Sequence, residues 1–147
     1  MHEKCLRVGS IVRTVRTGNS SCQVSYIAGV TWQAMFQRWV DAVNAPRDRE
    51  LLVAALADDA VVERHRPGEV DDVVERFTGV DAIHKWLART AARSVFALAG
   101  EVAVEGEQAR VEYAIVLDDF KNGGIWIARA RDGKLAHLSH KPFALPT

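Results

Sequence analysis

Four strand-like runs in the second half of the chain, joined by tight-turn signals, constrain the fold more than any other feature. The runs span residues 94–104, 108–119, 124–131 and 134–141. Asn122-Gly123 and Asp132-Gly133 separate the last three runs. Such dipeptides are strong signals for a tight turn between antiparallel strands. The second half is therefore predicted to form an antiparallel sheet whose strands follow one another along the chain.

The first half carries helical signals instead. Apolar residues recur at helical spacing from Trp32 to Val43, which predicts one buried face of an amphipathic helix. Thr31 can cap the start of this helix, and Asn44 with Pro46 ends it.

Two further short helices are predicted, one capped by Asp48 and ending at Asp58-Asp59, and one beginning after Gly79. Short strands over 60–64 and 73–77 lie between them, because β-branched residues gather there. Helices first and strands last is the order of an α+β domain.

Composition narrows the class of protein. The 147 residues fit one domain, with 48% hydrophobic and 26% charged residues, as in ordinary globular proteins. The net charge of zero argues against a nucleic-acid binder, and no apolar run reaches the ~18 residues of a membrane span. No secretory signal is visible, so a cytoplasmic location is expected. We divide the chain into an N-terminal extension, flexible by this reading, over 1–30 and a domain over 31–147.

The alternation of side chains along a strand predicts which residues face the interior. In the last strand, Ala136, Leu138 and His140 form the more apolar face, so we place them inside. Trp126 is predicted to point inward from the preceding strand. A three-residue loop over 131–133 would set Trp126 opposite Leu138.

The run over 108–119 allows two registers, and the residues leave both open. A two-residue turn at Asn122-Gly123 would turn one set inward: Tyr113, Ile115, Leu117 and Asp119. A three-residue turn would turn the other set inward: Glu112, Ala114, Val116 and Asp118. The choice decides which carboxylate reaches the interior.

Three residues are candidates for acid–base chemistry. His140 is predicted to change charge near neutral pH, as imidazoles do. Arg64 could hold a substrate oxygen, or could form an ion pair with Glu63 or the acidic loop that follows. Asp118 or Asp119 could act as a general base in a desolvated pocket.

Metal binding is not expected. His137 and His140 lie three residues apart on one strand and so point to opposite faces. Cys5 and Cys22 have neither zinc-site spacing nor a disulfide framework around them. We expect neither a metal nor a cofactor.

Several short motifs recur in an order that resembles the nuclear-transport-factor-2-like superfamily, in its SnoaL-like and ketosteroid-isomerase-like branch. The matching stretches are Phe36–Asn44, Leu56–Glu63, Thr78–Leu87 and Arg131–Leu135. The resemblance implies a cystatin-like fold, a cone-shaped curved antiparallel sheet packed on three N-terminal helices. It also implies one deep pocket and a homodimer, which we expect to form through the outer sheet face at Ile125 and Ile127.

The same resemblance implies a small-molecule role. In ketosteroid isomerases a Tyr, an Asp base and a protonated Asp do the chemistry, at positions that here hold Trp39, Arg64 and Ile125 or Trp126. That mechanism is therefore not expected. We predict instead a pocket for a small apolar ligand, serving a cofactor-free isomerase, dehydratase, cyclase or hydrolase, or a non-catalytic binding module. Its predicted lining is Trp39, Phe77, Tyr113, Trp126 and Leu138.

Overall fold

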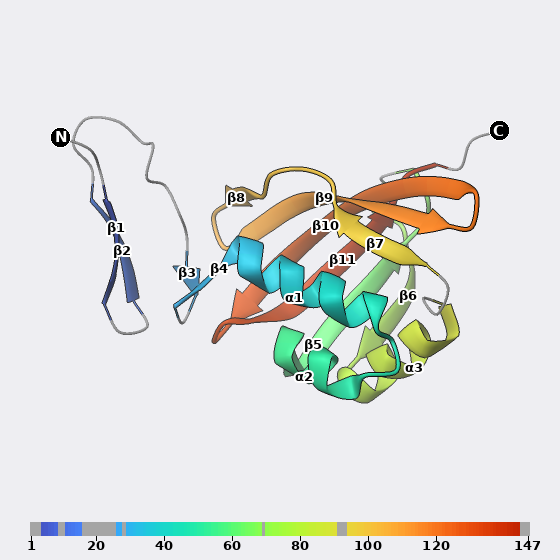
Figure 1. Ribbon diagram of the computed structural model, residues 1–147, viewed down its shortest axis with the longest axis horizontal. Helices are drawn as coiled ribbons and strands as arrows, with labels where there is room; N and C mark the ends of the chain where they lie inside the picture. Colours follow the sequence, from blue (N-terminus) through green and yellow to red (C-terminus); the bar gives the residue numbers. More distant parts are fainter. Residues whose placement is uncertain are drawn as a thin grey trace.

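One curved sheet and three helices build the chain from Trp32 onward in the computed structural model (Figure 1). The structure describes residues 4–8, 11–15, 26–27, 29–68, 70–90 and 94–144. The elements are α1 (Trp32–Asn44), α2 (Arg49–Ala55), β5 (Leu56–His65), β6 (Val73–Thr78), α3 (Val80–Thr90), β7 (Val95–Leu98), β8 (Ala103–Glu105), β9 (Gln108–Leu117), β10 (Phe120–Arg131) and β11 (Lys134–Pro142). The α+β arrangement predicted from the sequence is confirmed.

Among the described residues before α1 there are four short strands. They are β1 (Lys4–Val8), β2 (Ile11–Val15), β3 (Tyr26–Ile27) and β4 (Val30–Thr31). β1 pairs antiparallel with β2, and β3 pairs antiparallel with β4. The rest of the predicted extension, apart from Gly29 and including Cys22, lies outside the described residues.

The large sheet has the strand order β6-β5-β11-β10-β9-β7, and β8 pairs with β9 beyond the end of β7. All of its pairings are antiparallel except β5 with β11, which run parallel. The predicted antiparallel sheet is therefore mixed. The helices pack against the inner face of this sheet (Figure 1).

Helix α1 forms as its sequence predicts. The Thr31 hydroxyl accepts a hydrogen bond from the Ala34 amide at 3.0 Å, and the apolar face is buried. At its last residue, the Asn44 side chain donates to the Phe96 carbonyl at 2.8 Å and accepts from the Phe96 amide at 2.7 Å. This double hydrogen bond fastens the edge strand β7 to the end of the helix.

The boundary between α2 and β5 differs from the prediction. Helix α2 is capped by Asp48 as expected, but it ends at Ala55, and Leu56 is already extended. Leu56 pairs with Leu135 of β11, which lengthens β5 toward its start. Asp58 and Asp59 consequently lie exposed within a strand instead of ending a helix.

The hairpin between β9 and β10 turns earlier than predicted. Leu117 pairs with Phe120, so the turn is Asp118-Asp119, and Asn122-Gly123 lies inside β10. Asp118 adopts a positive φ of 53°, which aspartate tolerates better than most residues.

The inward register of β9 is the one that buries Tyr113. Tyr113 is 2% exposed, whereas Glu112 is exposed on the other face. The strand run predicted over 94–104 is divided into β7 and β8. Between them the Ala99 amide still donates to the Glu112 carbonyl at 2.9 Å.

The hairpin between β10 and β11 has a two-residue turn, not the three-residue loop considered above. Asp132 and Gly133 both have positive φ, 54° and 80°. A bulge then leaves Ala136 unpaired between Leu135 and His137. Leu135 therefore joins the buried face, and Trp126 stands opposite His140 instead of Leu138.

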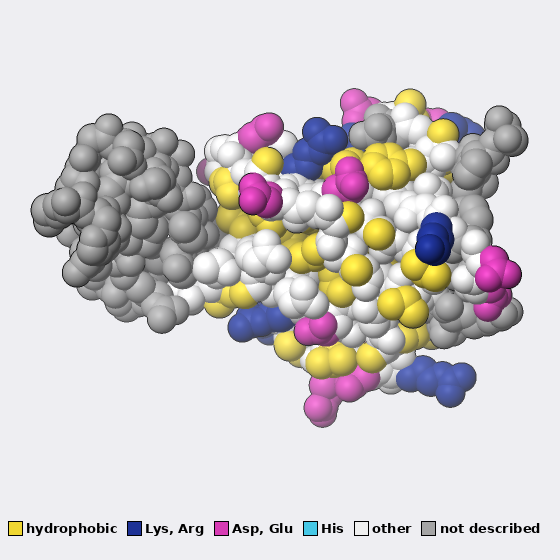
Figure 2. All heavy atoms as spheres, turned by 45° about the horizontal axis from the view of Figure 1, so that its top comes forward, with side chains coloured by type: hydrophobic (Ala, Val, Ile, Leu, Met, Phe, Trp, Pro, Cys, Tyr) yellow, Lys and Arg dark blue, Asp and Glu magenta, His cyan; other side chains and the backbone are white. Residues whose placement is uncertain are grey.

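The surface carries interspersed charges. On the face that Figure 2 shows, basic and acidic side chains alternate with apolar ones and do not gather by sign. Within the described residues, no helix combines the length and apolar character that crossing a bilayer requires.

Candidate functional site

A row of four side chains runs across the inner face of the sheet. Trp126 of β10 pairs with His140 of β11, His140 pairs with Arg64 of β5, and Arg64 pairs with Glu75 of β6. Neighbours across strands point to the same face of a sheet. Residues far apart in the chain are therefore brought into one line.

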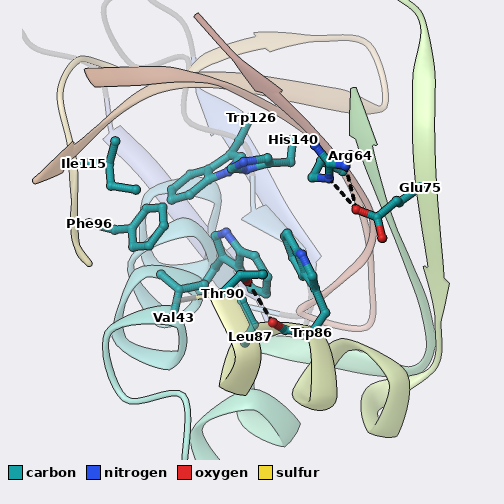
Figure 3. Close-up of a pocket in the computed structure, with 11 residues that line it drawn as sticks. Val43, Arg64, Glu75, Trp86, Leu87, Thr90, Phe96, Ile115, Trp126 and His140 are labelled. Carbon is teal, nitrogen blue, oxygen red and sulfur yellow. Dashed lines mark hydrogen bonds and ion pairs between the residues drawn. The ribbon is translucent and has the colours of Figure 1, made fainter. Parts of the chain in front are cut away.

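This row forms one wall of a cavity of about 320 Å³. The lining residues are Trp39, Val43, Arg64, Glu75, Trp86, Leu87, Thr90, Phe96, Ile115, Trp126 and His140. In Figure 3, Trp86 and Leu87 face Trp126 and His140 across the space, and Arg64 points toward Glu75. The volume and the aromatic walls match the cavities that hold small organic molecules.

The His140 ring is held by two hydrogen bonds. The Trp126 indole N–H donates to its Nδ1 at 2.9 Å, and its Nε2 lies 3.3 Å from the Tyr113 hydroxyl. An indole can only donate, so Nδ1 must accept and the ring proton must sit on Nε2. Tyr113 also stacks on this ring, with centroids 5.2 Å apart.

The surroundings of His140 favour its uncharged form. Burial, followed by the nearby positive charge of Arg64, lowers the pKa of His140 from 6.5 to about 4. The predicted change of charge near neutral pH is therefore wrong. Burial likewise raises the pKa of the Tyr113 hydroxyl above its ordinary value of 10.

Arg64 reaches the cavity and forms an ion pair there. Its Nε lies 2.7 Å, and a terminal nitrogen 2.6 Å, from Oε1 of Glu75. Of the two predicted alternatives for Arg64, the ion pair is the one observed, but with a different partner. Glu63 instead bonds Arg76 and His137 on the outer face, and these partners lower its pKa, Arg76 most strongly.

Glu75 is a charged cavity residue that sequence reasoning missed, as it missed Thr90 and Phe96. The strand predicted over 73–77 carried the signal, because alternation places Glu75 on the same face as Phe77. Phe77 was predicted to line the pocket.

Trp39 contributes an unused donor. Its side chain lines the cavity and is 1% exposed, and its indole nitrogen has no hydrogen-bond partner among the described residues. A buried donor left without a partner costs about 1–3 kcal/mol. Trp39 therefore combines a place in the cavity wall with a buried N–H that lacks an acceptor.

The structure brings together four of the eight predicted site residues in the cavity wall: Trp39, Arg64, Trp126 and His140. Phe77 stacks on Trp86 at 4.9 Å and supports it from behind. Tyr113 and Leu138 are buried beside the wall without lining the cavity.

Asp118 is the predicted catalytic residue that does not reach the cavity. It lies exposed in the β9–β10 turn and does not line the cavity. The described part of the chain holds no group of three or more His, Cys, Asp or Glu side chains arranged to bind a metal ion.

A curved sheet wrapped over three helices defines the nuclear-transport-factor-2-like fold, and comparison with solved structures shows that the chain has it. A candidate ketosteroid isomerase from Kribbella flavida superposes with a TM-score of 0.62 at 19% identity, over 78% of each chain. A candidate SnoaL-like isomerase from Agrobacterium tumefaciens gives 0.61 at 17% identity, over 76% of this chain and 97% of that one.

A candidate polyketide cyclase from Sinorhizobium meliloti is also similar, with a TM-score of 0.56 at 28% identity. It aligns over 71% of this chain and 91% of its own. No protein-family model matches the sequence, and no curated protein matches it. The resemblance predicted from short motifs is thus confirmed at the level of the fold.

Proposed function

We propose that the protein binds a small, largely apolar organic molecule in the cavity between α1 and the sheet. The observation that carries this proposal is the aromatic-walled space of about 320 Å³, lined in part by Trp39, whose buried indole N–H has no partner among the described residues. An apolar ligand with one acceptor oxygen would bury its rings against the walls and satisfy this donor.

Catalysis is the second candidate function. It is favoured by the polar side chains of the row, His140, Arg64 and Glu75, in the wall of the cavity. Arg64 would stabilise negative charge developing on a ligand oxygen. His140 is neutral and is bonded through both ring nitrogens to Trp126 and Tyr113, so it would hold these rings in place and not act as a base. Glu75 is the carboxylate in this wall, while Asp118 would need to leave its turn. Solved neighbours described as isomerases and a cyclase are consistent with such cofactor-free chemistry.

Calorimetric titration with two matched ligands tests the binding proposal. In 2-acetylnaphthalene a ketone oxygen stands where 2-isopropenylnaphthalene has a methylene group. The protein is expected to bind the ketone about tenfold more tightly, and Trp39→Phe to abolish that preference while keeping the ring.

The control is Trp32→Phe, the same change on the same helix at a buried Trp that does not line the cavity. It should leave the preference intact. Recovery of the ketone unchanged supports a binding module, and a new product supports an enzyme. Absence of saturable binding by both ligands would refute the proposal.

We also propose that two copies associate through the outer sheet face, which the three helices leave uncovered. Ile127 is half-buried on that face, but Ile125, predicted to be exposed there, is 5% exposed and contributes little. The cytoplasmic location and the boundary between extension and domain at residue 31 stay predictions.

A further inference from the structure

The ion pair at the end of the cavity has a consequence for which ligands can enter. Among the described residues that line the cavity, the charged side chains are Arg64 and Glu75. They are 34% and 39% exposed, so the pair lies where the cavity meets solvent. Their opposite charges leave this wall with no net charge.

The geometry of the pair leaves Arg64 poorly placed to hold a second carboxylate. Its Nε and one terminal nitrogen both point at the same oxygen of Glu75, at 2.7 and 2.6 Å. This edge is one of the two edges of the guanidinium that can hold a carboxylate in bidentate fashion, and Glu75 occupies it. A ligand carboxylate on the other edge would bring a second negative charge beside Glu75.

The other polar groups of the cavity do not replace Arg64. His140 is bonded to Trp126 and Tyr113 through its two ring nitrogens. Trp39 offers one N–H, enough for a neutral oxygen but not for a desolvated carboxylate. A charged ligand would therefore lose its hydration without gaining an adequate partner.

We propose that Glu75 is a specificity-determining residue, which makes the cavity select uncharged acceptor ligands over carboxylates by occupying Arg64. This inference rests on the proposed binding function and adds the charge class of the ligand. Specificity here comes from a repulsive element as well as from attraction, as in other discriminating sites.

The test compares 2-acetylnaphthalene with 2-naphthoate. The first carries a methyl ketone and the second a carboxylate at the same position of the same ring system. The wild-type protein is expected to bind the ketone at least tenfold more tightly. Glu75→Gln should tighten binding of 2-naphthoate about tenfold, because it frees Arg64, and should change ketone binding less than threefold.

Two further variants test whether the gain in 2-naphthoate affinity comes from Glu75 acting on Arg64. Glu63→Gln makes the same change on the outer face, where Glu63 pairs with Arg76, and should alter neither affinity. Adding Arg64→Met to Glu75→Gln should abolish the gain for 2-naphthoate. If Glu75→Gln does not fold, judged by its melting transition, Glu75→Ala takes its place.

If the wild-type protein binds both ligands with equal affinity, the proposed charge selection is wrong, whereas the proposed binding function stands. An unchanged preference in the folded Glu75 variant would overturn the charge selection as well. If neither ligand binds to any variant, the binding function fails and this inference fails with it.

Discussion

The position of one proton on His140 follows from its neighbour Trp126. The indole donates to Nδ1, so a second proton on the ring would set two N–H groups against each other. Protonation therefore requires this hydrogen bond to break, at a half-buried side chain whose desolvation and nearness to Arg64 already disfavour charge. The same contact that orients the ring also keeps it neutral.

Stability should consequently fall in mildly acidic solution. The pKa of His140 is 6.5 in an unfolded chain and about 4 in the folded protein, so between these values the unfolded state binds the extra proton. The contribution of neutral His140 to the free energy of unfolding is complete above about pH 6.5 and decreases as the pH drops toward 4. From pH 7 to pH 5 we expect a loss of about 2 kcal/mol, measured by urea unfolding.

The variant His140→Gln isolates this contribution. It removes the titrating group, and the difference between the two proteins subtracts every other ionisation. A pH dependence equally steep in His140→Gln and in the wild type would contradict the argument.

Strand β10 shows how a local turn signal is overruled within an element. Asn122-Gly123-Gly124 reads as a turn, yet all three residues pair with β9. The glycines serve close approach instead. A Cβ on Gly124 would lie 2.4 Å from the Lys141 carbonyl oxygen and 2.6 Å from the Tyr113 hydroxyl oxygen. The missing side chain is what lets Tyr113 lie across the strand and reach His140.

Gly124→Ala is therefore expected to cost about 3 kcal/mol of folding free energy, because the carbonyl it meets belongs to a paired backbone. Gly100→Ala is the matched control, since its Cβ would meet only the Glu112 Cβ at an ordinary 4.0 Å. Denaturant midpoints of the two variants measure the difference. Equal midpoints would show that β10 can shift to admit a methyl group.

At the scale of the whole molecule, the two sheet faces have different chemistry. The inner face holds the aromatic cavity, and the outer face holds an ion-pair network in which Glu63 bonds both Arg76 and His137. Beside it, Ile127, Arg129 and other side chains line a shallow groove. A second copy seated there would leave both cavities open to ligand.

Light scattering should accordingly give twice the monomer mass at micromolar concentration. Ile127→Asp should reduce it to the monomer mass, because burying an unpaired carboxylate in an interface is costly. Val95→Asp adds the same charge at the 61% exposed edge-strand position and should leave the dimer intact. A wild-type monomer would rule out the proposed association.

The sequence by itself determined the elements whose signals are local. Helical spacing and the Thr31 cap defined α1, the Asp132-Gly133 signal located one hairpin but not the length of its turn, and alternation placed Trp126 and His140 inward. Each of these follows from the backbone geometry of a few neighbouring residues.

Only the tertiary structure decided how these elements meet. The parallel pairing of β5 with β11 sets Arg64 beside His140, and the pairing with β6 gives Arg64 its partner Glu75. Register between distant strands depends on packing summed over whole faces, which no short window of sequence encodes. The α+β class could therefore be predicted from patterns and the cone-shaped fold from the family resemblance, whereas the row from Trp126 to Glu75, and the charge class of ligand we infer from it, depend on long-range strand pairing.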